Sequence, residues 1–244
     1  MVAIGIFATV INAPESFLFP LIPNSFLRNL LMGSLMGLTV MAIIYSPWGM
    51  RSGAHINPAI SIAFFRLGKL SAWDAFFYVL AQFMGGALGI FLVQQILGIP
   101  FTNLPVNYAV TVPGIGGWIA AFITEIALAF GLMSLMLVVS NNRRFRQYTG
   151  IFAGLLITTY ISVATPISGM SINPARTFAS ALPADVWTGA WIYYFCPTLG
   201  MLAAAENYRQ ITGCSSKDIC GKLCPNTETP CPFIDCPCRE AEII

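Results

Sequence analysis

Ser52-Gly-Ala-His-Ile-Asn57-Pro58-Ala59 and Ser168-Gly-Met-Ser-Ile-Asn173-Pro174-Ala175 are the two stretches that decide the fold of this chain. They share the frame S-G-x-x-I-N-P-A, and their asparagines lie 116 residues apart in a chain of 244. An asparagine before a proline marks a helix start, because Asn caps the first turn and Pro occupies a position whose N–H needs no partner. Each copy therefore predicts a half-helix, over about 57–66 and 173–182, that is too short to cross a bilayer.

The composition combines few charged residues with many apolar ones. Hydrophobic residues make up 57% of the chain and charged residues 9%, with a formal net charge of +2. A soluble domain carries roughly 25% charged residues and could not cover its surface with so few. The small net charge also argues against a nucleic-acid partner. We therefore expect a polytopic membrane protein whose surroundings are the lipid bilayer.

Long apolar stretches predict where the chain crosses that bilayer. A spanning helix needs about 20 mostly apolar residues, because each residue rises about 1.5 Å and the hydrocarbon core is roughly 30 Å thick. The stretches that meet or approach this length are 30–47, 75–97, 117–139, 148–166 and 187–205. Residues 1–13 are apolar but too few to span, and we interpret them as the end of a truncated first helix.

The order of spans and motifs predicts an inverted repeat. Because three spans separate the two copies, the second copy enters the membrane from the opposite side. Loops 51–69 and 140–147 and the end of the chain are rich in Lys and Arg, whereas 98–116 contains no charged residue. The positive-inside rule then places the basic loops and the C-terminus in the cytoplasm. The expected fold is an all-α membrane protein, with three helices and a half-helix in each repeat.

Half-helices that meet from opposite faces would bring two positive helix N-termini to the middle of the membrane. There the amides of Asn57 and Asn173 would donate hydrogen bonds to a permeating molecule. Such a centre favours neutral solutes with acceptor oxygens and opposes cations, including protons. Arg176 follows the second motif, and a cation beside the membrane interior is functional by default, with a lipid anchor as the alternative. We find no acid–base pair, nucleophile or phosphate-binding loop, so no enzyme activity is predicted.

Three stretches resemble the major intrinsic protein family, the aquaporins and glycerol facilitators. They are GLTVMAIIYSPWGMRSGAHINPAIS (37–61), AQFMGGALG (81–89) and SGMSINPARTFASALPA (168–184), and the resemblance covers about 1–207. It implies six tilted helices and two half-helices around a pore in each protomer, a homotetramer, and no cofactor for transport. We expect the protein in the bacterial inner membrane.

The resemblance also assigns a selectivity constriction, formed by Met36, Ile161, Met170 and Arg176. Water-selective relatives usually place Phe, His and a small residue beside the arginine, and glycerol facilitators favour Trp, Gly and Phe. The constriction expected here matches neither set and is less hydrophilic than that of strict water channels.

Other positions refine this resemblance. Thr177 and Ala181 stand where glycerol facilitators typically have Asp and a basic residue, which favours the aquaporin side. Glu125 matches a buried glutamate that accepts hydrogen bonds from loop N–H groups. His55, the only histidine, matches a loop histidine that we interpret as a structural contact rather than a pH gate.

Residues 208–244 form a second region, a tail that contains six of the seven cysteines. Cys220, Cys224, Cys231 and Cys236 offer enough thiolates for one tetrahedral zinc ion, although their spacing is not that of paired CxxC knuckles. Redox-active or palmitoylated thiols, or no specific role, are the alternatives. In the cytoplasm, structural disulfides are rare.

The function expected from these features is a passive channel for water or small neutral solutes. A facilitator of glycerol, ammonia or hydrogen peroxide is a variant of that function. A secondary transporter would need a coupling group near the midplane, and beyond Glu125 and Arg176 the spans have almost no ionisable residues. The other alternative is a non-conducting membrane protein whose metal- or redox-responsive cysteine tail is the active part.

Overall fold

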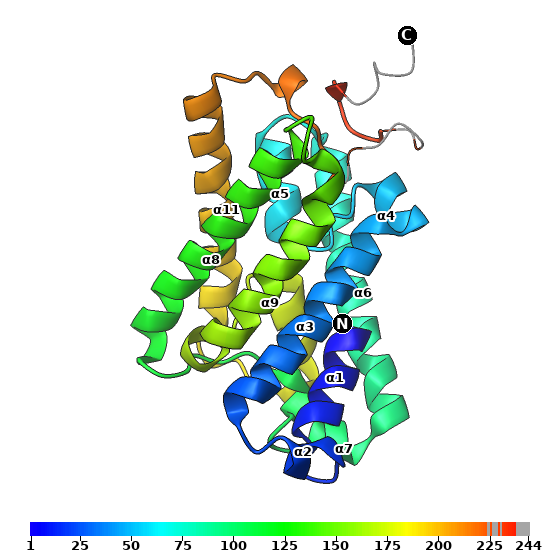
Figure 1. Ribbon diagram of the computed structural model, residues 1–244, viewed down its shortest axis with the longest axis vertical. Coiled ribbons are helices and arrows are strands. Elements are labelled where there is room, and N and C mark those ends of the chain that lie inside the picture. The colour runs from blue at the N-terminus through cyan, green and yellow to red at the C-terminus, as the bar shows by residue number, and fades with distance from the viewer. Residues whose placement is uncertain (224, 226–228, 230, 238–244) are drawn as a thin grey trace.

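Every regular element in the computed structural model is a helix, within the residues that the structure describes (1–223, 225, 229 and 231–237). The all-α fold class expected from the sequence is therefore confirmed. In chain order the elements are α1 (Val2–Asn12), α2 (Leu18–Leu21), α3 (Ser25–Tyr45), α4 (Pro47–Ser52), α5 (Pro58–Arg66), α6 (Ala72–Leu97), α7 (Ile99–Thr102), η1 (Asn107–Ala109), α8 (Gly117–Ser140), η2 (Arg146–Tyr148), α9 (Thr149–Ser168), α10 (Pro174–Ala184), α11 (Ala190–Thr212) and η3 (Ser216–Asp218). Figure 1 shows them as a bundle of long helices.

The long helices form two packed pairs, α3 with α9 and α8 with α11 (Figure 1). Within the described residues, α3, α6, α8 and the segment 146–168 that includes α9 are long and apolar enough to cross a membrane. α11 has 23 residues, but Glu206 and Arg209 lie in its last two turns. It runs from Ala190 to Thr212, so it starts and ends later in the chain than the predicted span 187–205.

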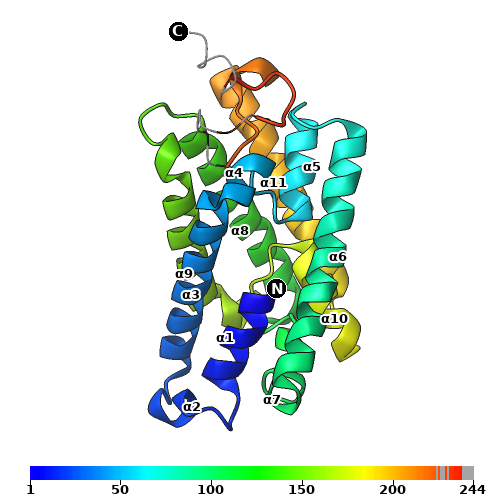
Figure 2. The same ribbon diagram turned by 90° about the vertical axis from the view of Figure 1, so that its right-hand side faces the viewer.

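Helix α1 is shorter than the spanning helices. Its 11 residues cover about 16 Å, which is about half of the hydrocarbon thickness. Figure 2 shows its N-terminal end at about mid-height, between α3 and α6. It contacts α6 closely, because a Cβ placed on Gly89 would lie 3.0 Å from the Cβ of Met1.

The two half-helices occupy opposite halves of the bundle. Figure 2 shows α5 in the half nearer the C-terminal tail and α10 in the other half. Each begins with the motif proline at the first helical turn, directly after an asparagine whose side chain caps it. The inverted repeat thus brings the two Asn-Pro-Ala segments toward each other from the two ends.

The basic loops gather at one end of the bundle. α4, the loop between α8 and α9, and the tail all lie at that end (Figure 2). Arg66, at the end of α5, forms an ion pair of 2.8 Å with Glu206 of α11. The assignment of this end to the cytoplasm stays a prediction.

Apolar residues of the tail pack against that same end of the bundle. Ile219, Cys220, Leu223 and Phe233 are buried, and they belong to the same apolar cluster as residues of α5 and α8. The predicted division at 207/208 remains untested, and α11 continues across it to Thr212.

Candidate functional site

The asparagines of the two motifs are linked by a reciprocal pair of hydrogen bonds. Asn57 Nδ2 donates to the carbonyl oxygen of Ile172 at 2.7 Å, and Asn173 Nδ2 donates to the carbonyl oxygen of Ile56 at 3.0 Å. Each acceptor is the residue directly before the opposite asparagine. The side-chain oxygens face their own helices, where Asn57 Oδ1 accepts from Ala59 N at 2.9 Å and Asn173 Oδ1 from Ala175 N at 3.1 Å. The two half-helices therefore meet N-terminus to N-terminus.

These bonds change the role expected for the amides. We expected the asparagine amides to donate to a permeating molecule, but one N–H of each is already engaged by the opposite repeat. An amide nitrogen has two N–H donors, so one remains for a molecule in the cavity. Because the first N–H is held by the opposite repeat, the amide group cannot rotate freely, and the direction of its second N–H is fixed.

Glu125 holds the loop before Asn173. Its side chain is fully buried on α8 and accepts from Ser171 N at 3.0 Å, Ile172 N at 2.7 Å and Ser168 Oγ at 2.8 Å. Met170 and Ile172 of this loop have positive φ values of 48° and 45°. A buried carboxylate needs such donors, and the strained loop needs an anchor, so each satisfies the other.

The loop before Asn57 has different anchors. Gln82 Nε2 of α6 donates to the carbonyl oxygen of His55 at 2.5 Å and to Ser61 Oγ at 2.9 Å. The His55 ring bonds through Nε2 to the carbonyl oxygen of Gly221 in the tail, at 2.9 Å. His55 is 4% exposed, and burial lowers its pKa to about 4, so the ring is neutral and donates this bond. Neither Gln82 nor Gly221 was predicted from the sequence.

One cavity of about 1120 Å³ contacts both motifs. Its lining includes the residues assigned to the constriction by resemblance, together with the motif asparagines: Met36, Asn57, Ile161, Met170, Asn173 and Arg176. It is also lined by Leu223 of the tail and by Pro105 and Val112 of the loop between α7 and α8. Because these two segments lie at opposite ends of the bundle (Figure 1), the cavity reaches from one end to the other.

Arg176 contacts a residue that the sequence analysis missed. Its guanidinium donates to Thr111 Oγ1, in the loop before α8, and Thr111 is 3% exposed. The methyl group of Thr111 also lies close to Gly169, because a Cβ there would be 2.8 Å from it. The arginine is thus held between α10 and a loop 65 residues earlier. Thr111 lies within the uncharged loop 98–116 and has no local sequence signal.

Three of the predicted cysteine ligands lie outside the cavity lining, in the tail. The sulfur atoms of Cys220, Cys231 and Cys236 lie within 4.8 Å of one another, and all three residues are buried. Cys224, the fourth predicted ligand, lies outside the described residues. Such a group of thiols can hold a metal ion, and the identity of that ion is not fixed by the geometry.

Comparison with known proteins places the chain in a family. Residues 3–208 match the model of the major intrinsic protein family. A probable NIP-type aquaporin of Nicotiana alata is 38% identical over 176 residues, which are 72% of this chain and 63% of the relative. Aquaporin NIP1-1 of Arabidopsis thaliana is 33% identical over 72% of this chain and 60% of its own length. The chain thus spans about three fifths of the length of these plant relatives.

An archaeal relative and a solved structure extend the comparison. Aquaporin AqpM of Methanothermobacter thermautotrophicus is 32% identical over 187 residues, covering 74% of this chain and 76% of the relative. The aquaglyceroporin of Plasmodium falciparum has the same fold, with a TM-score of 0.68 at 18% identity over 86% of this chain and 91% of its own. This chain is a multi-pass membrane protein and belongs to the major intrinsic protein family.

Proposed function

We propose that the chain forms a passive channel for water and small neutral solutes. The observation that supports this most directly is the pair of crossed asparagines on a cavity that reaches both ends of the bundle. Relatives named as aquaporins and an aquaglyceroporin neighbour agree with it. Transport of this kind needs no cofactor and no chemical reaction.

Cation exclusion follows from the charges around the cavity. Two half-helix N-termini, each worth roughly half a positive elementary charge, meet at the asparagines. Arg176 adds a full positive charge to the same lining. A cation or a proton that enters this region would meet positive potential from both repeats, whereas a neutral solute would find hydrogen-bond donors.

The composition of the expected constriction favours weakly selective passage. Met36, Ile161 and Met170 have no side-chain donors, so Arg176 and the backbone supply its polar side. Methionine side chains are also flexible. We infer that water passes together with glycerol, ammonia or hydrogen peroxide, and that a strict water filter is not formed.

The membrane setting is part of the same proposal. The basic loops at the tail end favour a cytoplasmic tail, and a homotetramer in a plasma membrane follows from the family's usual assembly. The prominent relatives include plant proteins, so the bacterial inner membrane rests on the sequence resemblance alone.

The test is a stopped-flow permeability measurement on proteoliposomes that contain the purified chain. Water, glycerol and ammonia are compared side by side with empty liposomes, and proton leak is followed with an internal pH dye. We expect flux of neutral solutes above the empty liposomes without proton leak in the wild type. Arg176→Val should add proton leak because it removes the cation from the cavity lining.

Arg144→Val is the matched control, since Arg144 is an exposed arginine in the loop between α8 and α9. It should behave as the wild type. Absence of water and glycerol flux in the wild type would exclude the channel, and equal proton leak in the two variants would exclude the role given to Arg176.

A further inference from the structure

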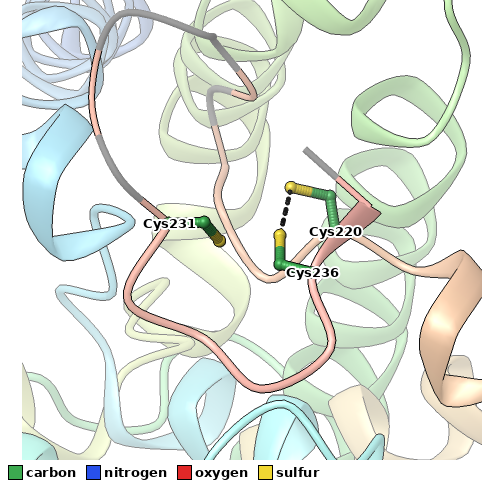
Figure 3. Close-up of side chains that lie close together, drawn as sticks. All are labelled: Cys220, Cys231 and Cys236. Atoms are coloured by element: carbon green, nitrogen blue, oxygen red, sulfur yellow. Dashed lines mark hydrogen bonds between the residues drawn. The ribbon is translucent and has the colours of Figure 1, made fainter. Parts of the chain in front are cut away.

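Three buried thiols of the tail meet in a geometry that suits a metal ion. The sulfur atoms of Cys220 and Cys236 are 3.3 Å apart, and Cys231 completes a group within 4.8 Å (Figure 3). Four-coordinate zinc with Zn–S bonds of about 2.3 Å separates its sulfur ligands by roughly 3.8 Å. The observed range brackets that separation, so small shifts would place all three sulfurs on one ion.

A buried lysine lies beside this group. Lys69 is 0% exposed, and its ammonium donates to the carbonyl oxygens of Ile234 at 3.2 Å and Asp235 at 3.0 Å, the two residues before Cys236. No carboxylate oxygen among the described residues lies within 4 Å of this ammonium. The charges of Asp235 and Asp218 act on Lys69 from beyond contact distance, so the buried cation has no contact ion pair among the described residues, and burying such a cation is costly. Three thiolates around a divalent ion have a net charge of −1, which would balance Lys69.

The same segment is fastened to the loop before Asn57. Besides the bond from His55 to Gly221, Leu223 N donates to the carbonyl oxygen of Gly53 at 3.2 Å. The ring of Phe233 stacks on His55 with the ring centroids 4.9 Å apart. Gly221 is needed there, because a Cβ on it would lie 2.6 Å from the Phe233 ring. Phe233 lies between Cys231 and Cys236 in sequence, so the thiol group and the docking contacts belong to one short unit.

We propose that Cys220, Cys231 and Cys236 bind a zinc ion, and that this ion clamps the tail onto the loop before Asn57. Binding replaces the three thiol protons, which pass to solvent, and a fourth ligand completes the tetrahedral coordination of the ion. Without the ion, the three thiols no longer join the two ends of the tail segment. The tail then detaches from Gly53 and His55.

The clamp reaches the cavity through Leu223, which is part of its lining at the tail end. A clamped tail keeps this apolar side chain at the mouth, and removal of zinc takes it away. If the chain conducts as proposed above, the zinc-free form is therefore the more permeable one. This consequence rests on the proposed function, whereas zinc binding and tail docking do not.

Metal content tests the site directly. The full-length protein, purified with zinc chloride and then desalted, should contain about one zinc ion per chain by plasma mass spectrometry. Cys220→Ser and Cys236→Ser should lose it, and Lys69→Met should weaken zinc affinity roughly tenfold because it removes the balancing charge. Cys214→Ser is the matched control, since Cys214 is a tail cysteine outside the group.

Trypsin reports on docking independently of transport. Lys222 is 0% exposed and Lys217 is exposed, so the zinc-loaded protein should be cut after Lys217 and not after Lys222. EDTA should make the bond after Lys222 cleavable in the wild type, and zinc chloride should restore protection. Water permeability measured on the same samples should rise with EDTA and fall again with zinc.

Several outcomes would overturn the proposal. Zinc content that is equal in Cys220→Ser and the wild type removes the site, as does a Cys220–Cys236 disulfide in protein purified without oxidant. Lys222 that stays protected after complete zinc removal removes the clamp. A different outcome separates the two proposals. If no sample is permeable to water, but zinc content and the protection of Lys222 from trypsin change as expected, the channel function is contradicted and the zinc clamp is not.

Discussion

The loops before the two half-helices have equivalent positions in the repeat but different anchors. The loop before Asn173 is held from inside the bundle. Glu125 accepts three hydrogen bonds from it, the Tyr193 hydroxyl donates to the carbonyl oxygen of Ser168, and the Asn57 amide donates to that of Ile172. The loop before Asn57 is held by Gln82 of α6 and, through His55, by the tail. The carboxylate needs only the transmembrane scaffold, whereas the second arrangement depends on a segment after the last helix. One half of the pore is thus held by the bundle itself, whereas the other half also depends on the tail.

The largest effect should come from breaking the Glu125 anchor. Glu125→Ala leaves three donors without an acceptor inside the bundle, and we expect a loss of at least about 3 kcal/mol in the free energy of unfolding. Thermal unfolding in detergent measures this loss. Glu125→Gln keeps one acceptor oxygen and should lose less, and Glu15→Ala, at an exposed acid, should have no effect. Equal stability of Glu125→Ala and the wild type would refute the anchor.

An intermediate effect should come from the first loop. Gln82→Leu removes two neutral hydrogen bonds, each worth about 1 kcal/mol, so we expect about 2 kcal/mol. Gln95→Leu, at an exposed site of the same helix, is the control.

A double-mutant cycle sharpens this result. Because Gln82 and Phe233 support the same loop, Gln82→Leu and Phe233→Ala should be non-additive in the free energy of unfolding. Purely additive losses would mean that the tail does not support the loop.

The smallest effect concerns pH. Burial lowers the pKa of His55 to about 4 when the tail is docked, whereas the ordinary value is 6.5. Between pH 4 and 6.5, His55 therefore binds a proton only when the tail is undocked. Docking is therefore complete above pH 6.5 and weakens as the pH falls toward 4, by roughly tenfold at pH 5.5. The phenol of Tyr78, 5.6 Å from the His55 ring, does not titrate in this range.

Hydrogen exchange at the amide of Leu223, corrected for its intrinsic rate, measures this change. His55→Phe keeps an aromatic ring without the titration and is compared with the wild type over the same pH range. Since the cysteines titrate equally in both proteins, their contribution cancels. An identical pH response in the two would contradict the role of His55.

The sequence predicted those features of the fold that are decided by a few neighbouring residues, such as the starts of the two half-helices. The Asn-Pro pairs identify both half-helix starts, because capping is decided within one turn. Helix α11 continues past the predicted span 187–205 to Thr212, and Gly213, with a φ of 66°, is the kind of residue that ends a helix. Polar residues in its last turns hid the continuation, since the prediction followed apolar character and not capping.

Contacts between distant segments were not predictable in the same way. Arg176 meets Thr111 across 65 residues, and His55 meets Gly221 across 166, and no pattern near either residue indicates its partner. The tail was interpreted as a separate region because of its cysteines. Its few apolar residues, such as Leu223 and Phe233, bury themselves on the channel end, which only the packing reveals.

The reciprocal asparagine bonds set an order for the biosynthesis of the protein. Asn57 leaves the ribosome 115 residues before its acceptor, Ile172. During that interval α5 has its own cap, but the bond that orients the amide is missing. The centre of the pore can form only after α9 has inserted and the second loop has folded back. A ribosome-bound chain that stops before Ile172 therefore contains a complete first repeat without a finished half of the pore.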